Sequence, residues 1–88
     1  MIEKKVRIQN RLGLHARPAA LIVQTAGKFI SNITLVKDSL QVNGKSIMGV
    51  MMLAAEYGSE IVIRANGSDA EAAVEALEAL IQSKFNEE

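Results

Sequence analysis

The stretch Ile33-Thr34-Leu35-Val36-Lys37-Asp38-Ser39-Leu40-Gln41-Val42-Asn43-Gly44 contains two short strand patterns with a turn between them. The first pattern is rich in β-branched residues, and the second alternates Leu40 and Val42 with polar residues. Asp38-Ser39 can turn the chain between them, and Asn43-Gly44 can end the second strand. This stretch therefore predicts two neighbouring strands of an antiparallel sheet.

Strand and helix patterns follow on both sides of that stretch. Strands are predicted where Ile2, Val6 and Ile8 share one face, and again over residues 61–63. Helices are predicted from Ala16 to about residue 28, from Ser46 to about residue 55, and after Ser68. The order is β-α-β-β-α-β-α. Because the strands alternate polar and apolar residues, we expect one face of the sheet to be covered by helices and the other to be exposed to solvent. We assign an α+β two-layer sandwich with a four-stranded antiparallel sheet.

The ends of two helices carry recognisable signals. Gly27 suits a left-handed cap at the end of the first helix. Ser68 and Glu71 have the spacing of a capping box at the start of the last helix. The apolar residues that follow at helical spacing predict the buried face of that helix; they are Ala73, Val74, Leu77, Leu80, Ile81 and Phe85.

Composition excludes several functional classes. With 88 residues the chain forms one domain, residues 1–88, and its ten basic residues balance ten acidic ones. A neutral chain with three aromatic residues is a poor ligand for nucleic acid or for a membrane surface. The sequence has no cysteine and one histidine, so we expect no metal site and no cofactor. No signal-peptide pattern or transmembrane run occurs, and we expect a cytoplasmic location.

The single histidine lies where the first helix is predicted to begin. Proline is tolerated only in the first turn of a helix, so Pro18 places the helix start near Ala16 and His15 at the N-cap. Histidine is a poor capping residue compared with Ser, Thr, Asp or Asn. A residue that violates a local rule in an otherwise consistent sequence is a candidate for function.

The chemistry at this position favours a phosphoryl group. The positive end of a helix offers unpaired N–H groups, here those of Ala16 and Arg17, and Arg17 adds donors that match phosphate oxygens. The same positive end disfavours imidazolium, which keeps a neutral nitrogen of His15 available as a nucleophile. Pro18 fixes the first turn and completes the predicted phosphate-binding set. We predict that His15 accepts the phosphoryl group and that Arg17 assists.

The segment Gly13-Leu14-His15-Ala16-Arg17-Pro18-Ala19-Ala20 resembles the active-site segment of the HPr family, the histidine phosphocarriers of the bacterial phosphoenolpyruvate:sugar phosphotransferase system. Length and element order agree over nearly the whole chain. The resemblance implies an open-faced β-sandwich with three helices on one face of the sheet. It also implies that His15 takes a phosphoryl group on Nδ1 from enzyme I and passes it to a IIA domain, with Leu12 and Leu14 in the docking surface.

Ser46 begins the second predicted helix and is well placed as its N-cap. A phosphate there would be tolerated at the helix N-terminus, and it would repel acidic groups of a partner. The surrounding segment resembles the regulatory serine segment of HPr proteins. The resemblance implies that the HPr kinase/phosphorylase modifies Ser46, that this slows transfer at His15, and that the modified form can bind a carbon-catabolite transcriptional regulator.

The second predicted helix contains more large apolar residues than one buried face can hold. Ile47 and Met48 lie next to Ser46, and exposed methionine suits a surface that binds several partners. Met51 and Met52 can instead fill gaps under the sheet. We predict an apolar docking rim around His15, formed by Leu12, Leu14, Ile47, Met48 and Met51. A carrier exchanges partners quickly, so its contacts are small and transient, and we expect a monomer.

The sequence therefore predicts a phosphoryl carrier and not a stand-alone enzyme, because no Gly-rich loop for a nucleotide occurs. Two other hypotheses remain open. The chain could be a regulatory relative that acts as a binding module without sugar transport. It could also be a small α+β domain in which His15 only contacts an anion.

Overall fold

The computed structural model describes residues 1–87. This part of the chain contains four strands, three α-helices and a final 3₁₀ turn. The elements are β1 (Ile2–Arg7), α1 (Ala16–Ala26), β2 (Asn32–Lys37), β3 (Leu40–Asn43), α2 (Ile47–Met52), β4 (Glu60–Asn66), α3 (Ala70–Gln82) and the 3₁₀ turn η1 (Lys84–Asn86). The predicted order β-α-β-β-α-β-α is confirmed.

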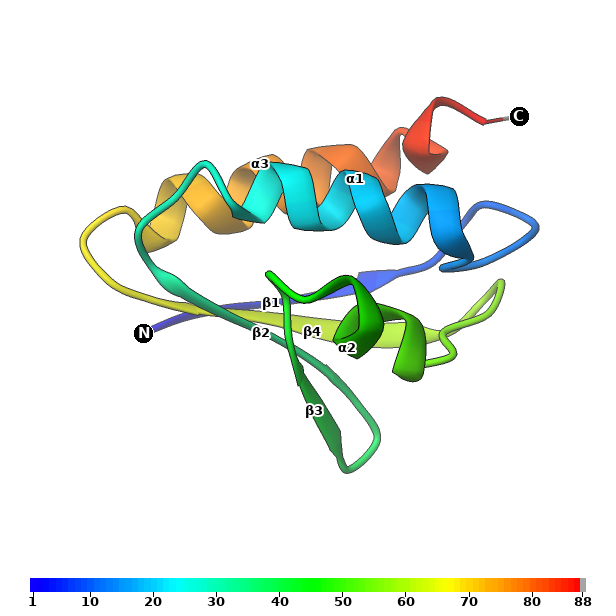
Figure 1. The fold of residues 1–88 in the computed structure, drawn as a ribbon, viewed down its shortest axis with the longest axis horizontal. Helices are drawn as coiled ribbons and strands as arrows, with labels where there is room; N and C mark the ends of the chain where they lie inside the picture. The colour runs from blue at the N-terminus through cyan, green and yellow to red at the C-terminus, as the bar shows by residue number, and fades with distance from the viewer. Residues whose placement is uncertain (88) are drawn as a thin grey trace.

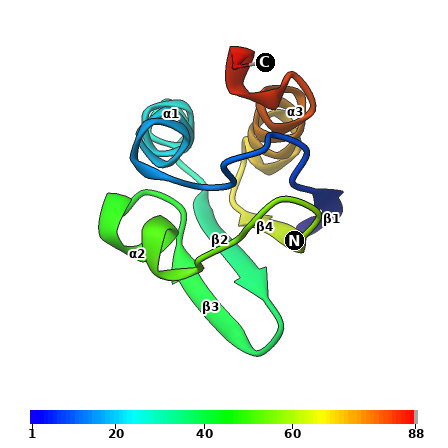
Figure 2. The same cartoon turned by 90° about the vertical axis from the view of Figure 1, so that its right-hand side faces the viewer.

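The four strands form one antiparallel sheet in the order β1-β4-β2-β3. In the β2–β3 hairpin Lys37 pairs with Leu40, and Asp38 adopts the left-handed backbone conformation that the tight turn requires. The predicted open-faced sandwich is confirmed: α1 and α3 lie side by side over the sheet, and α2 packs beside α1 at the β3 side (Figures 1 and 2).

The core lies between the sheet and the helices, as the alternation along the strands predicts. In β4, Ile61, Ile63 and Ala65 are buried, while the residues between them are partly exposed. Ile22 from α1 and Leu77 from α3 are fully buried against this face. Every helix within residues 1–87 is too short or too polar to cross a bilayer.

The start of α3 differs from the predicted capping box. The residue that precedes the helix is Asp69, not Ser68, and no side chain caps the first turn. The Asp69 carboxylate instead accepts hydrogen bonds from the amides of Ile30 and Ser31 and from the Ser31 hydroxyl. Asp69 therefore ties the α1–β2 connection to the start of α3, a long-range role that the local sequence pattern does not reveal.

α1 ends next to Gly27 as predicted, but the conformation of Gly27 and the end of α2 differ from the prediction. Gly27 follows α1 with a φ of −66°, so it is right-handed and not a left-handed cap. The second helix ends at Met52, and the chain leaves it through Ala54, which has a positive φ.

The C-terminal tail leaves the axis of α3 earlier than the apolar spacing predicts. α3 ends at Gln82, and Lys84, Phe85 and Asn86 all have a φ of 57°. Their left-handed turn brings the Phe85 side chain back into the core, where it is completely buried. The tail is therefore fixed on the molecule and directed toward the start of α1, as the red segment in Figure 2 shows.

Candidate functional site

His15 occupies the N-cap position of α1, as Pro18 predicted. Its backbone is extended, its carbonyl accepts the first helical bond from the Ala19 amide at 3.0 Å, and its side chain makes no capping bond. The side chain is 36% exposed. The imidazole is therefore not used to stabilise the helix and remains accessible at the positive end of α1.

The loop before His15 is held by a close backbone approach at Gly13. Gly13 has a φ of +68°, and a Cβ atom there would lie 2.5 Å from the Ala55 carbonyl oxygen and 2.8 Å from Glu56 Cα. The Leu14 amide donates to the same Ala55 oxygen at 2.8 Å. Only glycine fits this position, and the α2–β4 connection thereby fixes where His15 begins the helix.

The two leucines of this loop have different surroundings. Leu12 is exposed, whereas the Leu14 side chain is only 5% exposed and belongs to the core. The prediction that Leu14 lines the docking rim is therefore wrong. Its side chain packs into the core, and a sequence pattern in a loop does not report that direction.

The Glu87 carboxylate contacts the imidazole from the C-terminal tail. Its two oxygens lie 3.1 and 3.2 Å from Nε2 of His15. Oε1 also accepts a hydrogen bond from Nδ2 of Asn10 at 2.9 Å, and Oε2 accepts one from Arg17 at 3.0 Å. We call this carboxylate with its three partners, Asn10, His15 and Arg17, the tail clamp.

The tail clamp keeps Glu87 ionised. The hydrogen bond from Asn10, followed by that from His15, lowers the pKa of the Glu87 carboxyl, and the Arg17 contact adds to the effect. Asn10 is itself buried, and its Nδ2 also donates to the Gly13 carbonyl at 2.8 Å. Neither residue stands out in the sequence, because Asn10 has only the character of a turn residue and no periodicity marks Glu87.

The predicted phosphate-binding residues divide into two groups. Ala16 and Arg17 are exposed in the first turn of α1, where backbone N–H groups have no partner within the helix. One guanidinium nitrogen of Arg17 is engaged by the Phe85 carbonyl at 2.9 Å and by Glu87. Pro18 has no N–H and its ring is buried, so it can fix the first turn of α1 but offers a phosphate no donor.

Ser46 caps α2, because its hydroxyl oxygen accepts the Gly49 amide at 3.0 Å. The apolar residues around it are exposed: Ile47 at 43%, Met48 at 72% and Met51 at 44%. Met52 is exposed as well, so neither Met51 nor Met52 is a core residue. α2 packs against α1, which places this apolar surface on the same side of the sheet as His15.

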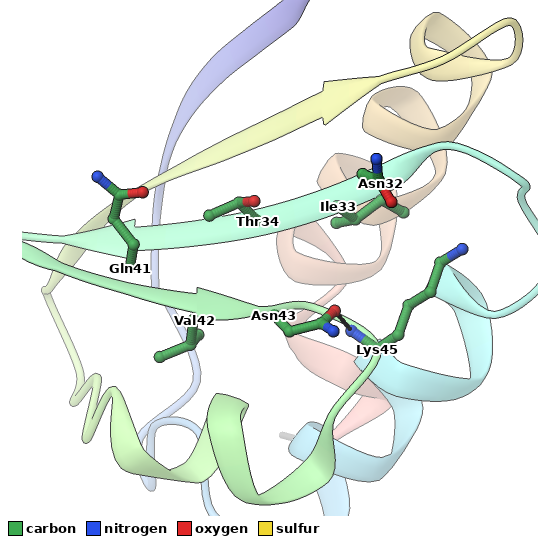
Figure 3. Close-up of a pocket in the computed structure, with 7 residues that line it drawn as sticks. All are labelled: Asn32, Ile33, Thr34, Gln41, Val42, Asn43 and Lys45. Carbon is green, nitrogen blue, oxygen red and sulfur yellow. Dashed lines mark hydrogen bonds between the residues drawn. The ribbon is translucent and has the colours of Figure 1, made fainter.

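Figure 3 shows a hollow between β2 and β3. Its polar lining includes Asn32, Gln41, Asn43 and Lys45, and the Lys45 ammonium donates to the Phe29 carbonyl at 2.7 Å. Within residues 1–87, no three His, Cys, Asp or Glu side chains gather as a metal site requires.

Comparison with known proteins assigns the family. Residues 2–83 match the family model described as the phosphotransferase-system HPr component phosphorylation site. The chain belongs to the HPr family. The phosphocarrier protein HPr of Treponema pallidum is 57% identical over 88 residues, which is all of both chains. HPr from Thermoanaerobacter tengcongensis superposes with a TM-score of 0.97 at 53% identity, covering 100% of this chain and 99% of that one.

The HPr family also includes a relative named for catabolite repression. The structure of Crh from Bacillus subtilis, an intertwined dimer with swapped domains, superposes with a TM-score of 0.77 at 47% identity and covers 94% of this chain and 95% of that one. As a member of the HPr family, the present chain is a phosphocarrier protein of the phosphotransferase system. Its expected monomeric state stays a prediction.

Proposed function

We propose that the chain carries a phosphoryl group on Nδ1 of His15, taken from phosphorylated enzyme I and passed to the IIA domain of a sugar permease. One observation carries this proposal. His15 lies at the N-terminus of α1 with a partly exposed ring and no capping bond, and Glu87 contacts one ring nitrogen and not the other. The other nitrogen is left for the reaction.

The residues around His15 suit the transfer of a phosphoryl group between nitrogens. The lone pair of Nδ1 forms the new N–P bond while the N–P bond in the donor breaks. The negative oxygens then meet the free first-turn amides of Ala16 and Arg17 and the positive end of the helix. The guanidinium of Arg17 carries five N–H donors, and its tail contacts use one nitrogen, so other donors are left for an incoming phosphate.

The partners dock on the exposed apolar rim next to His15. Leu12 and the α2 residues Ile47, Met48 and Met51 supply large exposed side chains in a molecule whose other large apolar residues are mostly buried. A small rim of flexible methionines binds several surfaces weakly and releases them quickly. We propose that the chain does this as a monomer in the cytoplasm.

Ser46 is the proposed regulatory site of the same rim. We propose that the HPr kinase/phosphorylase transfers phosphate to its hydroxyl, which already lies at the N-terminus of α2. The phosphate places about two negative charges beside exposed Met48. Those charges repel an acidic docking surface and slow the phosphorylation of His15, and the modified face can bind a carbon-catabolite transcriptional regulator.

The likeness to Crh favours a second candidate function, regulatory docking without sugar transport. Both candidates use the same rim and the same serine. They differ in whether the phosphoryl group moves on from His15 to a IIA domain.

The experiment supplies phosphoenolpyruvate with a labelled phosphoryl group, enzyme I and a sugar-specific IIA protein. His15 is the only histidine of the chain, so His15→Ala is the matched control. We expect acid-labile label on the wild-type chain, its transfer to IIA, and no label on the variant. Label that stops at this chain supports the regulatory candidate. Acid-labile label on His15→Ala contradicts the proposal.

A further inference from the structure

We propose that Glu87 is the positioning residue of His15: its carboxylate holds the proton on Nε2 and so directs the phosphoryl group to Nδ1. The inference rests on the proposed phosphorylation of His15 and adds how the ring is prepared for it. It concerns a residue near the C-terminus, far in sequence from the histidine it serves.

The chemistry of the contact decides which ring nitrogen holds the proton. An ionised carboxylate only accepts hydrogen bonds, so a nitrogen that bonds to it carries a hydrogen. Both oxygens of Glu87 lie within 3.2 Å of Nε2 of His15. The pKa of the Glu87 carboxyl is lowered, so this group is ionised at neutral pH. In the neutral ring the lone pair is therefore on Nδ1, the nitrogen that must attack phosphorus.

The carboxylate is held at both of its oxygens before any partner arrives. Asn10 holds Oε1 and Arg17 holds Oε2. The Asn10 amide must present its nitrogen here, because its oxygen would otherwise face the Glu87 carboxylate and the Gly13 carbonyl. Phe85, fully buried two residues earlier, anchors the tail itself. The ring is thus oriented by groups that are already in place.

The same contact serves the phosphorylated state. When the N–P bond forms at Nδ1, the hydrogen on Nε2 stays where it is, and no proton has to move during the transfer. The carboxylate then balances the positive charge of the phosphorylated, Nε2-protonated ring. With Nε2 blocked by Glu87, a phosphoryl donor reaches only Nδ1.

The test uses the full chain with phosphoramidate as the donor, and enzyme I is left out. The N–P bond of phosphoramidate breaks as ammonia leaves with the bonding electrons, and the new N–P bond forms on the ring. Phosphorus NMR distinguishes the two histidine phosphates, and nitrogen–proton NMR of the unmodified ring reports which nitrogen carries hydrogen. Failure of enzyme I to label His15 would contradict the proposed function and leave this result unaffected.

Glu87→Ala is the main variant, because it removes the carboxylate and leaves the bond from Arg17 to the Phe85 carbonyl. Glu87→Gln keeps one acceptor oxygen without the charge. Glu75→Ala removes an exposed carboxylate from α3 and is the matched control.

We expect the wild type and Glu75→Ala to show a protected Nε2 hydrogen and phosphate on Nδ1 only. In Glu87→Ala the Nε2 hydrogen should lose its protection, and a tenth or more of the product should be Nε2-phosphohistidine. That share corresponds to a free-energy difference of about 1.4 kcal/mol or less between the Nε2 route and the Nδ1 route. Glu87→Gln should lie between the two. Three results would each overturn the proposal. They are a ring hydrogen on Nδ1 in the wild type, no histidine phosphate in the wild type, and a Glu87→Ala variant that behaves as the wild type does.

Discussion

Replacing Gly13 by alanine should destabilise the protein more than the same change at any open turn glycine. Gly13 has a φ of +68°, and an alanine held there costs about 1–2 kcal/mol. Its Cβ would also lie 2.5 Å from the Ala55 carbonyl oxygen, which is backbone and cannot rotate away. Forcing an atom into such a site costs a further 1–3 kcal/mol or so, for a total of about 2–5 kcal/mol.

Gly58 provides the matched control for this calculation. Its φ is +87°, so alanine is strained there too, but nothing lies within 4 Å of the added Cβ. Gly58→Ala should therefore lose only about 1–2 kcal/mol of unfolding free energy. Urea denaturation and thermal melting measure both variants, with about 4–8 °C of melting temperature per kcal/mol at this chain length. Equal losses for the two variants would refute the argument from the Ala55 contact.

Three further changes test other parts of the molecule. Ser46→Ala should lower the unfolding free energy by about 1 kcal/mol, because the Gly49 amide loses its cap. The same variant should no longer be labelled by the HPr kinase/phosphorylase, and unchanged labelling would place the modification elsewhere. The Ser31 hydroxyl and then the Ile30 amide lower the pKa of Asp69, so this carboxylate stabilises the fold above about pH 4, and the contribution is lost as the pH falls through the lower folded-state value. Urea curves between pH 7 and pH 2.5 should therefore show a shallower acid loss for Asp69→Asn than for the wild type, and parallel curves would contradict this. Met48→Asp should raise the KM of the chain as a substrate of enzyme I roughly tenfold, with little change in kcat. Ile30 is similarly exposed and lies beyond the other end of α1, so Ile30→Asp should leave this KM unchanged. Equal effects of the two changes would exclude a specific rim.

The fold and the position of His15 could be predicted because their signals are local. The hairpin pattern around Asp38-Ser39 fixed two strands, and the ring of Pro18 permits only the first turn of a helix. Ser46 was recognised as a cap for the same reason, since its partner, Gly49, lies three residues away. In each case the residues that determine the structure are neighbours in the sequence.

The parts that could not be predicted depend on contacts between distant segments. Phe85 continues the apolar spacing of α3, yet the chain turns left-handed before it, and that turn brings Glu87 to His15, 72 residues away. Leu14 packs into the core while its amide bonds to Ala55, on a connection that no local pattern joins to the loop. Asp69 likewise binds Ser31 from across the fold instead of capping its own helix.

The most direct measurement is the site of phosphate attachment after the chain is phosphorylated by phosphoenolpyruvate and enzyme I. Long-range phosphorus–proton NMR on the intact product shows which ring nitrogen carries the phosphoryl group. We expect a single phosphohistidine, at His15, bonded through Nδ1, that disappears when unlabelled IIA is added. Phosphate on another residue, or on Nε2 of His15, would contradict it.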